Sequence, residues 1–286
     1  MNQTEIRQRT ALSWALDPSM FLAEVSGMTL DGWQIDALNY SGLRLAMNCS
    51  RQSGKSTIAA ARGFHSALFM PRSLILLVSP SLRQSGELFR KCRDLLDWLP
   101  RWLRPSLIED NRLSIQFENQ SRIVSLPGTE TKIRGFSGAS AVIVDEASRV
   151  LDELIFALRP MLSVSGGELI LGSTPFGKRG YFHKIMTADD DIWKRVTVTA
   201  NECPRISDEF LAEERAEMPD QFYQQEYFCA FSDRSSQIFS WEEIQAAVTD
   251  EVLPLFSQVA GVESSAVEAD ALYPLFSQPN DGGEDE

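Results

Sequence analysis

Short apolar runs recur along the chain, and each ends in polar or turn-forming residues. They cover residues 45–49, 73–79, 141–144 and 168–172. Runs of this length without strict alternation are typical of strands buried on both faces of a parallel sheet. Residues 193–199 form a further predicted strand. The pattern therefore predicts an α/β fold with a mainly parallel central sheet.

The segments around these runs have helical or hairpin patterns. Residues 1–26 are predicted to form a helical lead-in with a break at Asp17-Pro18, and residues 81–102 and 207–231 have apolar positions at helical spacing. Residues 113–126 alternate apolar and polar positions across a short polar turn, which indicates an antiparallel hairpin. We therefore expect flanking helices and a β-hairpin insertion.

Composition places the chain among globular proteins, with 43% hydrophobic and 23% charged residues. No apolar run approaches the roughly 20 residues that a membrane helix needs, and the N-terminus has no signal-peptide core. Four separate cysteines and two histidines form no metal-binding or disulfide pattern. We therefore expect a protein that stays in the compartment where it is made, without contact with a membrane.

The formal net charge of −13 is concentrated at one end of the chain. Residues 240–286 carry eleven acidic residues and no Lys or Arg, so that residues 1–239 hold 29 acidic against 27 basic residues. A nearly neutral body can still present a basic face to phosphates, and the net charge therefore excludes no nucleic-acid partner. Within the tail, residues 252–258 recur in residues 271–278, and we predict that residues 241–286 are poorly ordered.

The stretch 45–57 has the order of a phosphate-binding loop: an apolar strand, a polar turn, Gly54-Lys55-Ser56-Thr57 and a helix-prone segment. Gly54 would let backbone amides approach phosphates, Lys55 would reach their β/γ oxygens, and the Ser56 hydroxyl would bind Mg²⁺. Cys49 replaces the first glycine of the usual motif. An ordinary strand-turn-helix with an incidental Gly-Lys-Ser remains the alternative.

A second polar group follows the run at residues 141–144, where Asp145 and Glu146 stand together. Open α/β sheets bind ligands at the carboxyl ends of their strands. In a P-loop ATPase, Asp145 would hold Mg²⁺ and Glu146 would orient and deprotonate the attacking water. Two acids after an apolar run also commonly begin a helix, so that this string gains weight only together with the loop.

Two further strings are compatible with a nucleotide site. Trp33-Gln34 precedes the loop, where the Gln34 amide could bond to the adenine edge while the ring packs nearby; a helix start with a buried Trp is the alternative. Ser173 and Thr174 follow the run at residues 168–172 and could respond to loss of the γ-phosphate. A plain strand terminator explains Ser173-Thr174-Pro175 equally well.

Taken in order, these strings resemble the ATPase domain of phage large terminase subunits, which pump DNA into capsids. The loop at residues 50–57 is similar to that family's phosphate loop, which carries Arg-Gln and lacks the first Gly. Trp33-Gln34, Asp145-Glu146 and Gly172-Ser173-Thr174-Pro175 resemble its adenine, acidic and coupling motifs, and Gln225-Glu226-Tyr227 also looks familiar. The resemblance covers roughly residues 25–245.

The resemblance implies a P-loop NTPase of the additional-strand, RecA/helicase-like type that uses ATP and Mg²⁺. It divides the chain into the lead-in (1–26), the ATPase domain (27–240) and the acidic tail (241–286). It implies Glu146, Arg51 and Lys55 as catalytic residues and Ser56 and Asp145 as metal-binding residues. The implied nucleotide-binding residues are Trp33, Gln34, Ser50, Arg51, Gln52, Ser53, Gly54, Lys55, Ser56, Thr57, Ser173 and Thr174.

Partners also follow from the resemblance alone. They are double-stranded DNA, a portal protein, a small terminase subunit and further copies of the chain in a ring on the capsid, in the cytoplasm of a bacterial host. An arginine that stabilises the transferring phosphoryl group could be Arg51, or could come from a neighbouring subunit, with Arg101 and Arg104 as further candidates. We expect an ATPase that translocates DNA.

The family continues into an RNase H-like nuclease domain, for which about forty residues after Trp241 are too few. We therefore expect no nuclease activity and a truncated or ATPase-only member. Two alternatives to a packaging motor remain. One is a helicase-like DNA-dependent ATPase, which Asp-Glu-Ala and Ser-Thr-Pro also resemble, and the other is a non-catalytic prophage remnant.

Overall fold

The computed structural model describes residues 2–128 and 135–232, where strands and helices alternate along the chain. The strands are β1 (Arg44–Cys49), β2 (Leu74–Ser79), β3 (Leu107–Asp110), β4 (Ser114–Phe117), β5 (Arg122–Pro127), β6 (Ala141–Asp145), β7 (Glu168–Ser173) and β8 (Lys194–Val198). The α-helices are α1 (Gln3–Leu16), α2 (Pro18–Ser26), α3 (Gly32–Asn39), α4 (Lys55–Phe69), α5 (Leu82–Trp98), α6 (Asp152–Leu158), α7 (Gly180–Thr187), α8 (Asp208–Glu217) and α9 (Asp220–Phe228). Three short 3-10 helices are η2 (Ala147–Arg149), η3 (Arg159–Leu162) and η4 (Ala200–Glu202).

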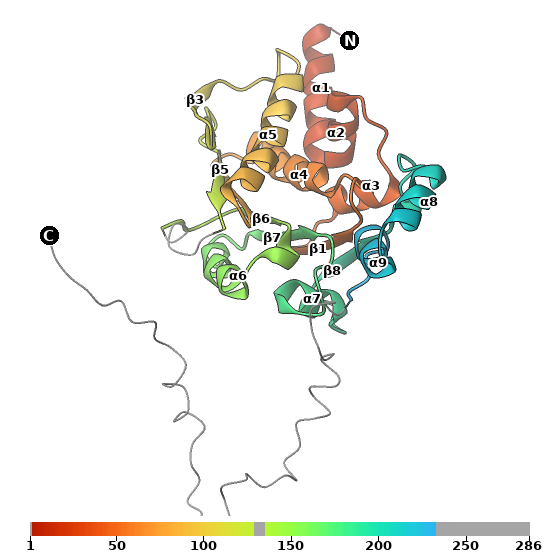
Figure 1. Ribbon diagram of the computed structural model, residues 1–286. Coiled ribbons are helices and arrows are strands. Elements are labelled where there is room, and N and C mark those ends of the chain that lie inside the picture. The colour runs from red at the N-terminus through yellow and green to blue at the C-terminus, as the bar shows by residue number, and fades with distance from the viewer. Residues whose placement is uncertain (1, 129–134, 233–286) are drawn as a thin grey trace, which may run out of the picture. The chain divides into compact units, whose positions relative to one another are not determined.

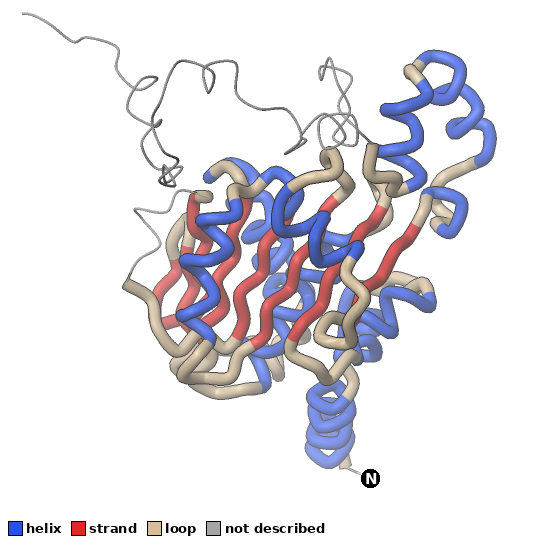
Figure 2. The backbone as a smooth tube through the Cα atoms, turned by 90° about the horizontal axis from the view of Figure 1, so that it is seen from below, coloured by secondary structure: helices blue, strands red, loops and turns tan. Residues whose placement is uncertain are grey.

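The strands form one eight-stranded sheet in the order β3-β4-β5-β2-β6-β7-β1-β8. All neighbours from β5 to β8 run parallel, whereas β3 and β4 pair antiparallel. The predicted α/β class with a mainly parallel sheet is confirmed. β7 lies between β1 and β6, so that an additional strand separates the phosphate-loop strand from the acidic strand. The carboxyl ends of all three strands therefore meet at one edge (Figure 2).

Helices cover both faces of this sheet (Figure 1). Because side chains alternate along a strand, Ile75 and Leu77 of β2 pack with α4 and α5 in one core, whereas Leu76 and Val78 pack with α6 and α7 in the other. Both faces of the central strands are thus buried, which explains why their sequences are continuous apolar runs.

The helical lead-in belongs to the first of these cores. The side chain of Asp17 accepts hydrogen bonds from the amides of Ser19 and Met20 and caps α2, whose first residue is Pro18. This cap accounts for the predicted break between α1 and α2. Phe21 is completely buried against α4, and its ring is 6.3 Å from that of Phe64. The lead-in therefore supports the helix that follows the phosphate loop.

The predicted hairpin is present as β4 and β5, and β5 also pairs parallel with β2, which joins the hairpin to the central sheet. The strand β3 was not predicted, since four residues are too few to show a period. The predicted helical segment 207–231 is two helices, α8 and α9, separated at Met218-Pro219. The acidic tail at residues 241–286 lies outside the described residues.

Candidate functional site

The phosphate loop connects the end of β1 to the start of α4. Gly54 has φ 96°, and a Cβ atom there would lie 2.9 Å from the Gln34 amide nitrogen, so glycine is required. Cys49, where the usual motif has its first glycine, is still part of β1 and pairs with Val198 of β8. Its extended backbone accommodates any residue. The missing glycine is therefore compatible with a working loop.

Two contacts fix the shape of this loop. The Ser50 amide donates to the Val198 carbonyl (2.9 Å), and the Ser53 hydroxyl donates to the Ser50 carbonyl (2.9 Å). The amides of Lys55 and Ser56 have no acceptor within α4, because helix geometry leaves the first N–H groups of a helix without one, whereas the Thr57 amide donates to the Gly54 carbonyl (2.9 Å). Together with the helix dipole, these amides favour an anion in front of Lys55.

Lys55 lies between the loop and the acidic strand. Its ammonium group is 3.6 Å from a carboxylate oxygen of Glu146, and the side chains are 10% and 24% exposed. Glu146 has φ 54°, a left-handed conformation uncommon for a residue other than glycine, asparagine or aspartate. The turn at the end of β6 thus directs this carboxylate back to the loop, and the role of Glu146 in orienting and deprotonating the attacking water stays a prediction.

Asp145 is the last residue of β6 and is partly buried beside the loop. Its Oδ1 atom is buried without a hydrogen-bond partner. Burial raises the pKa of the Asp145 carboxyl above its ordinary value, and the Glu146 charge adds to this, whereas Lys55 and the Ser56 hydroxyl act in the opposite direction. A buried carboxylate with a free oxygen, next to a hydroxyl, fits a divalent cation.

The described residues contain no cluster of three or more His, Cys, Asp or Glu side chains that could hold a metal ion. This finding is compatible with Mg²⁺ at Ser56 and Asp145. Mg²⁺ usually keeps several waters and is bound by one or two protein oxygens plus the phosphates of a nucleotide.

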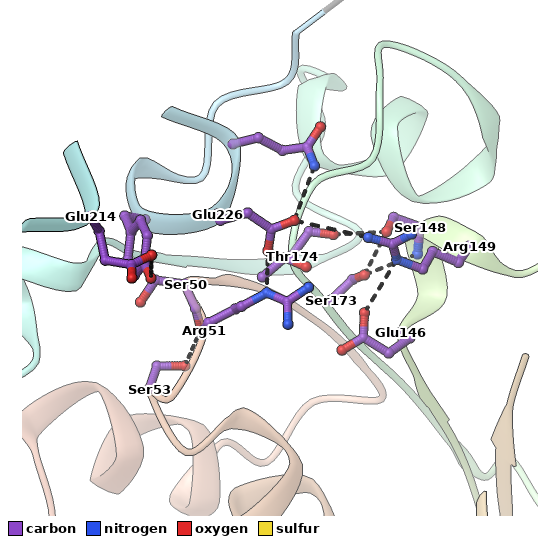
Figure 3. A network of polar contacts seen from close by, with 12 residues as sticks. Ser50, Arg51, Ser53, Glu146, Ser148, Arg149, Ser173, Thr174, Glu214 and Glu226 are labelled. Carbon is purple, nitrogen blue, oxygen red and sulfur yellow. Dashed lines mark hydrogen bonds and ion pairs between the residues drawn. The ribbon is translucent and has the colours of Figure 1, made fainter. Parts of the chain in front are cut away.

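Ser173 ends β7 and contacts the turn that follows Glu146. Its hydroxyl lies 2.6 Å from that of Ser148 and accepts a hydrogen bond from the Ser148 amide (3.1 Å). The Ser148 hydroxyl also donates to the Thr174 carbonyl (2.7 Å). Ser173 and Thr174 are thus linked directly to the acidic turn, on the strand that separates it from the phosphate loop (Figure 3).

A carboxylate from α9 reaches the start of the phosphate loop (Figure 3). The Arg51 Nε–H donates to an oxygen of Glu226 at 2.5 Å, and the Arg51 amide donates to the Glu226 carbonyl (3.1 Å). The other carboxylate oxygen of Glu226 is 3.9 Å from Arg149, whose Nε is 3.9 Å from Glu146. The hydrogen bond from Arg51 to Glu226 also raises the pKa of Arg51 above its ordinary value.

Gln34 lies behind the loop, where both ends of its amide have partners. The amide nitrogen donates to the Ser53 carbonyl (3.1 Å), and the amide oxygen accepts from the Asp31 backbone N–H (3.0 Å). Trp33, the second residue of α3, is partly buried and packs against the first core. Gln34 is therefore a support of the phosphate loop in this structure, and its contact with adenine stays a prediction.

The loop borders two cavities. A cleft of about 510 Å³ is lined by Gly54, Lys55 and Glu146 and by further residues of the loop, α5 and η2. A second cavity of about 520 Å³ lies between the loop and α8, and its walls include Arg205, Phe210 and Tyr227. Both cavities have Arg51 and Gln52 in their lining. We call them the phosphate cleft and the side pocket.

Several residues of this site were not predicted. Lys91 lies in the predicted helical segment 81–102 and was given no role in the site, but its ammonium donates to the Thr57 hydroxyl (3.1 Å) in the phosphate cleft. Gln84 lines the same cleft seven residues earlier, a spacing that places both on one face of α5. Arg205 bonds to Asp31 through two nitrogens and also donates to the Ser53 carbonyl. The sequence around a single polar residue does not indicate which cavity its side chain will face.

The described residues form no helix long and apolar enough to cross a membrane. A family model described as terminase large subunit, T4likevirus-type, N-terminal, matches residues 46–246, more than half of the chain. The matched region includes the phosphate loop, the acidic turn and Ser173. It therefore contains most of the residues that line the phosphate cleft.

Solved structures with a similar fold are phage proteins. The large terminase ATPase domain of Thermus phage P74-26 has TM-score 0.65 and 21% identity, over 76% of this chain and 100% of that one. The large terminase of a thermophilic bacteriophage in complex with ATP-gamma-S has TM-score 0.58 and 13% identity, over 71% of this chain and 53% of that one. The bacteriophage HK97 large terminase has TM-score 0.59 and 16% identity, over 71% and 51%. At these identities the likeness establishes the fold, and this chain spans about half the length of the latter two proteins.

Proposed function

The chain belongs to the family of phage large terminase subunits of the T4-like type, and from this premise we propose that it is an ATP-hydrolysing motor domain of DNA packaging. Hydrolysis would drive double-stranded DNA into a capsid. The partners would be the DNA, a portal protein, a small terminase subunit and further copies of this chain in a ring. The structure describes no second catalytic domain within residues 2–128 and 135–232, and the expected lack of nuclease activity stays a prediction.

One observation carries the ATPase proposal. Lys55 at the start of α4 and Glu146 at the end of β6 are 3.6 Å apart across the phosphate cleft, although β7 separates their strands. The buried Lys55 ammonium lies in front of the N-terminal amides of α4, where it suits a phosphate. The partly exposed Glu146 carboxylate lies beside it, where it suits the attacking water. The left-handed backbone of Glu146 supports a functional reason for this geometry.

The roles of the remaining residues follow from their positions. Ser56 and Asp145 would hold Mg²⁺, which when bound neutralises charge on the phosphate oxygens. The Lys55 ammonium would bind those oxygens, and Glu146 would orient a water and accept its proton. Arg51 and Arg149 line the cleft and would stabilise negative charge that develops on the transferring group.

The nucleoside would occupy the side pocket. Glu146 and β6 lie on one side of the phosphate loop, whereas the side pocket, with Arg205 after β8, lies on the other. A triphosphate with its γ-phosphate towards Glu146 would therefore direct its ribose and base to Phe210 and Tyr227. Aromatic side chains suit the faces of a base, and we assign Gln34 the support of the loop in addition to its predicted contact.

The experiment that tests this function measures DNA-stimulated ATP hydrolysis and nucleotide binding in Glu146→Gln. We expect hydrolysis to fall by about 10²–10⁴-fold, the usual contribution of a general base, while binding remains. Glu213→Gln, which neutralises an exposed carboxylate on α8, is the matched control. Hydrolysis that does not depend on Glu146 would refute its role as base, and binding without any hydrolysis by the wild-type protein would favour the non-catalytic alternative.

A further inference from the structure

Glu226 is a buried charged residue to which the proposed function assigns no role. Glu226 is 8% exposed as a whole residue, and its carboxylate lies between two arginines that line the phosphate cleft. One carboxylate oxygen of Glu226 accepts a hydrogen bond from Arg51 Nε at 2.5 Å. The other oxygen is 3.9 Å from Arg149 and accepts a hydrogen bond from the side-chain amide of Gln225 (3.2 Å). A buried carboxylate is costly unless it is compensated in this way.

The two arginines differ in what else holds them. The Arg149 guanidinium lies over the Phe176 ring, 4.0 Å from its centroid, and is 3.9 Å from Glu146. The Arg51 side chain is 60% exposed, and an exposed arginine keeps most of its rotamer freedom unless a partner fixes it. Glu226 supplies that partner, and it also bonds to Arg51 through the backbone.

The hydrogen bond to Glu226 leaves the two terminal guanidinium nitrogens of Arg51 available for a phosphate. Glu226 takes the Nε–H, while the two terminal nitrogens of the guanidinium point to the side of Glu146 (Figure 3). These nitrogens form the fork that binds phosphate oxygens. The single negative charge between Arg51 and Arg149 also offsets the repulsion of two cations on one cleft.

We propose that Glu226 is a positioning residue that holds the guanidiniums of Arg51 and Arg149 towards the phosphates, so that α9 forms part of the hydrolytic site. The inference rests on the proposed ATPase function. Because preorganised cations act mainly on charge that develops in the transition state, losing Glu226 lowers kcat more than it weakens nucleotide binding. Removing the negative charge of Glu226 beside Arg51 and Arg149 also makes the cleft more positive, which opposes any loss of ATP affinity.

The first experiment is a double-mutant cycle of Glu226→Gln and Arg51→Ala on the full chain. We expect Glu226→Gln alone to lower kcat by about 10- to 100-fold and to change the Kd for ADP by less than about threefold. In the Arg51→Ala background, the same change lowers kcat by less than about threefold, because Phe176 and Glu146 also hold Arg149, so that most of the effect of Glu226 passes through Arg51. Equal losses in both backgrounds, or kcat and Kd that change together, overturn the proposal.

Arg51→Lys gives a second route that leaves Glu226 intact. Lysine keeps the charge but cannot donate to Glu226 and present a planar fork at the same time. We expect a kcat loss similar to that of Glu226→Gln, and wild-type kcat in Arg51→Lys contradicts the proposal even if Glu226→Gln does not fold. Glu213→Gln on α8 is the control for the removal of one negative charge.

A measurement without hydrolysis separates this inference from the proposed function. Nitrogen-15 NMR of the nucleotide-free protein follows exchange of the Arg51 Nε–H with water. Exchange that is about tenfold or more faster in Glu226→Ala than in wild type supports the contact, even for a protein that hydrolyses no ATP. Equal exchange in both proteins shows that Glu226 does not hold Arg51, whatever the ATPase activity.

Discussion

Two clefts of this protein contain several charged side chains, and the larger one is less suited to chemistry. A cleft of about 730 Å³ lies between α5 and the loop before β4, and its lining includes Arg83, Arg90, Arg93 and Arg112. We call it the arginine cleft. The phosphate cleft measures about 510 Å³. Each cleft is lined by four basic residues, which in the phosphate cleft are Arg51, Lys55, Lys91 and Arg149, so that volume alone would favour the arginine cleft.

The two clefts differ in how their charges are held. In the arginine cleft, Arg90 and Glu87 are 2.8 Å apart but 66% and 52% exposed, so that water screens the pair and its side chains move freely. In the phosphate cleft, the Lys55 side chain is 10% exposed, and the Glu226 side chain that bonds to Arg51 of its lining is 11% exposed. The Asp145 Oδ1 is buried and has no hydrogen-bond partner. Burial strengthens the interactions between charges, and several side chains directed at one point hold those charges in place. These two properties distinguish a reactive site from a charged surface.

Lys55→Ala removes the central charge of the phosphate cleft and is expected to have the largest effect. One charge-assisted contact contributes about 1.5–3 kcal/mol, and we expect ATP affinity to fall about 10- to 100-fold with loss of hydrolysis. Fluorescent-nucleotide titration measures this. Lys184→Ala, on α7, is the matched control, and an equal loss in both variants would show that general charge decides binding.

Asp145→Asn tests the buried, free carboxylate. Its raised pKa means that folding favours the protonated form, so that stability is present below the ordinary value of 3.8 and is lost as pH rises through the folded-state pKa. Without Mg²⁺ and nucleotide, we expect the variant to have a higher Tm than wild type, with a difference that grows as the pH rises from 3.8 through the folded-state pKa of Asp145. Hydrolysis should fall by about 100-fold or more.

Thermal unfolding in a chelating buffer and an ATPase assay check this pair of effects. A variant less stable than wild type at neutral pH would show that the attraction between the Asp145 and Lys55 charges outweighs the effect of burial. The same comparison in the arginine cleft, with Asp110→Asn, should give lower or unchanged stability, because Asp110 is partly exposed and paired with Arg93 (2.6 Å).

Gln34→Ala tests how strongly the support behind the loop matters. It leaves the Ser53 carbonyl and the Asp31 amide without their side-chain partner. We expect ATP affinity to fall about 3- to 10-fold and Tm by about 2–4 °C per kcal/mol lost. Asp36→Ala, at an exposed position of α3, is the control. A large loss of preference for ATP over GTP would instead favour the predicted contact with adenine.

Arg83→Ala and Arg112→Ala in the arginine cleft should have the smallest effect. Both residues are exposed and line the arginine cleft rather than the phosphate cleft. We expect basal ATP hydrolysis and nucleotide affinity within about twofold of wild type. A larger change in basal hydrolysis would show that the arginine cleft is coupled to the site.

Local pattern alone predicted the sheet and the phosphate loop. Residues 74–78 and 141–144 are continuous apolar runs because both faces of a central parallel strand are buried, and this requirement acts on each residue separately. Gly54 could be recognised in the same way, since its backbone conformation is a local property. A family model matches this region, which agrees with the resemblance inferred from the loop and the acidic pair.

The partners of these residues were decided only by the tertiary structure. Glu226 reaches Arg51 from 175 positions later in the chain, and Ser148 meets Ser173 because β6 and β7 are neighbours in the sheet. A side chain's own sequence window has no information about which distant charge will lie against it. The sequence therefore determined which residues could bind a phosphate. The packing of α9 against the loop determined how Arg51 and Arg149 of the phosphate cleft are held.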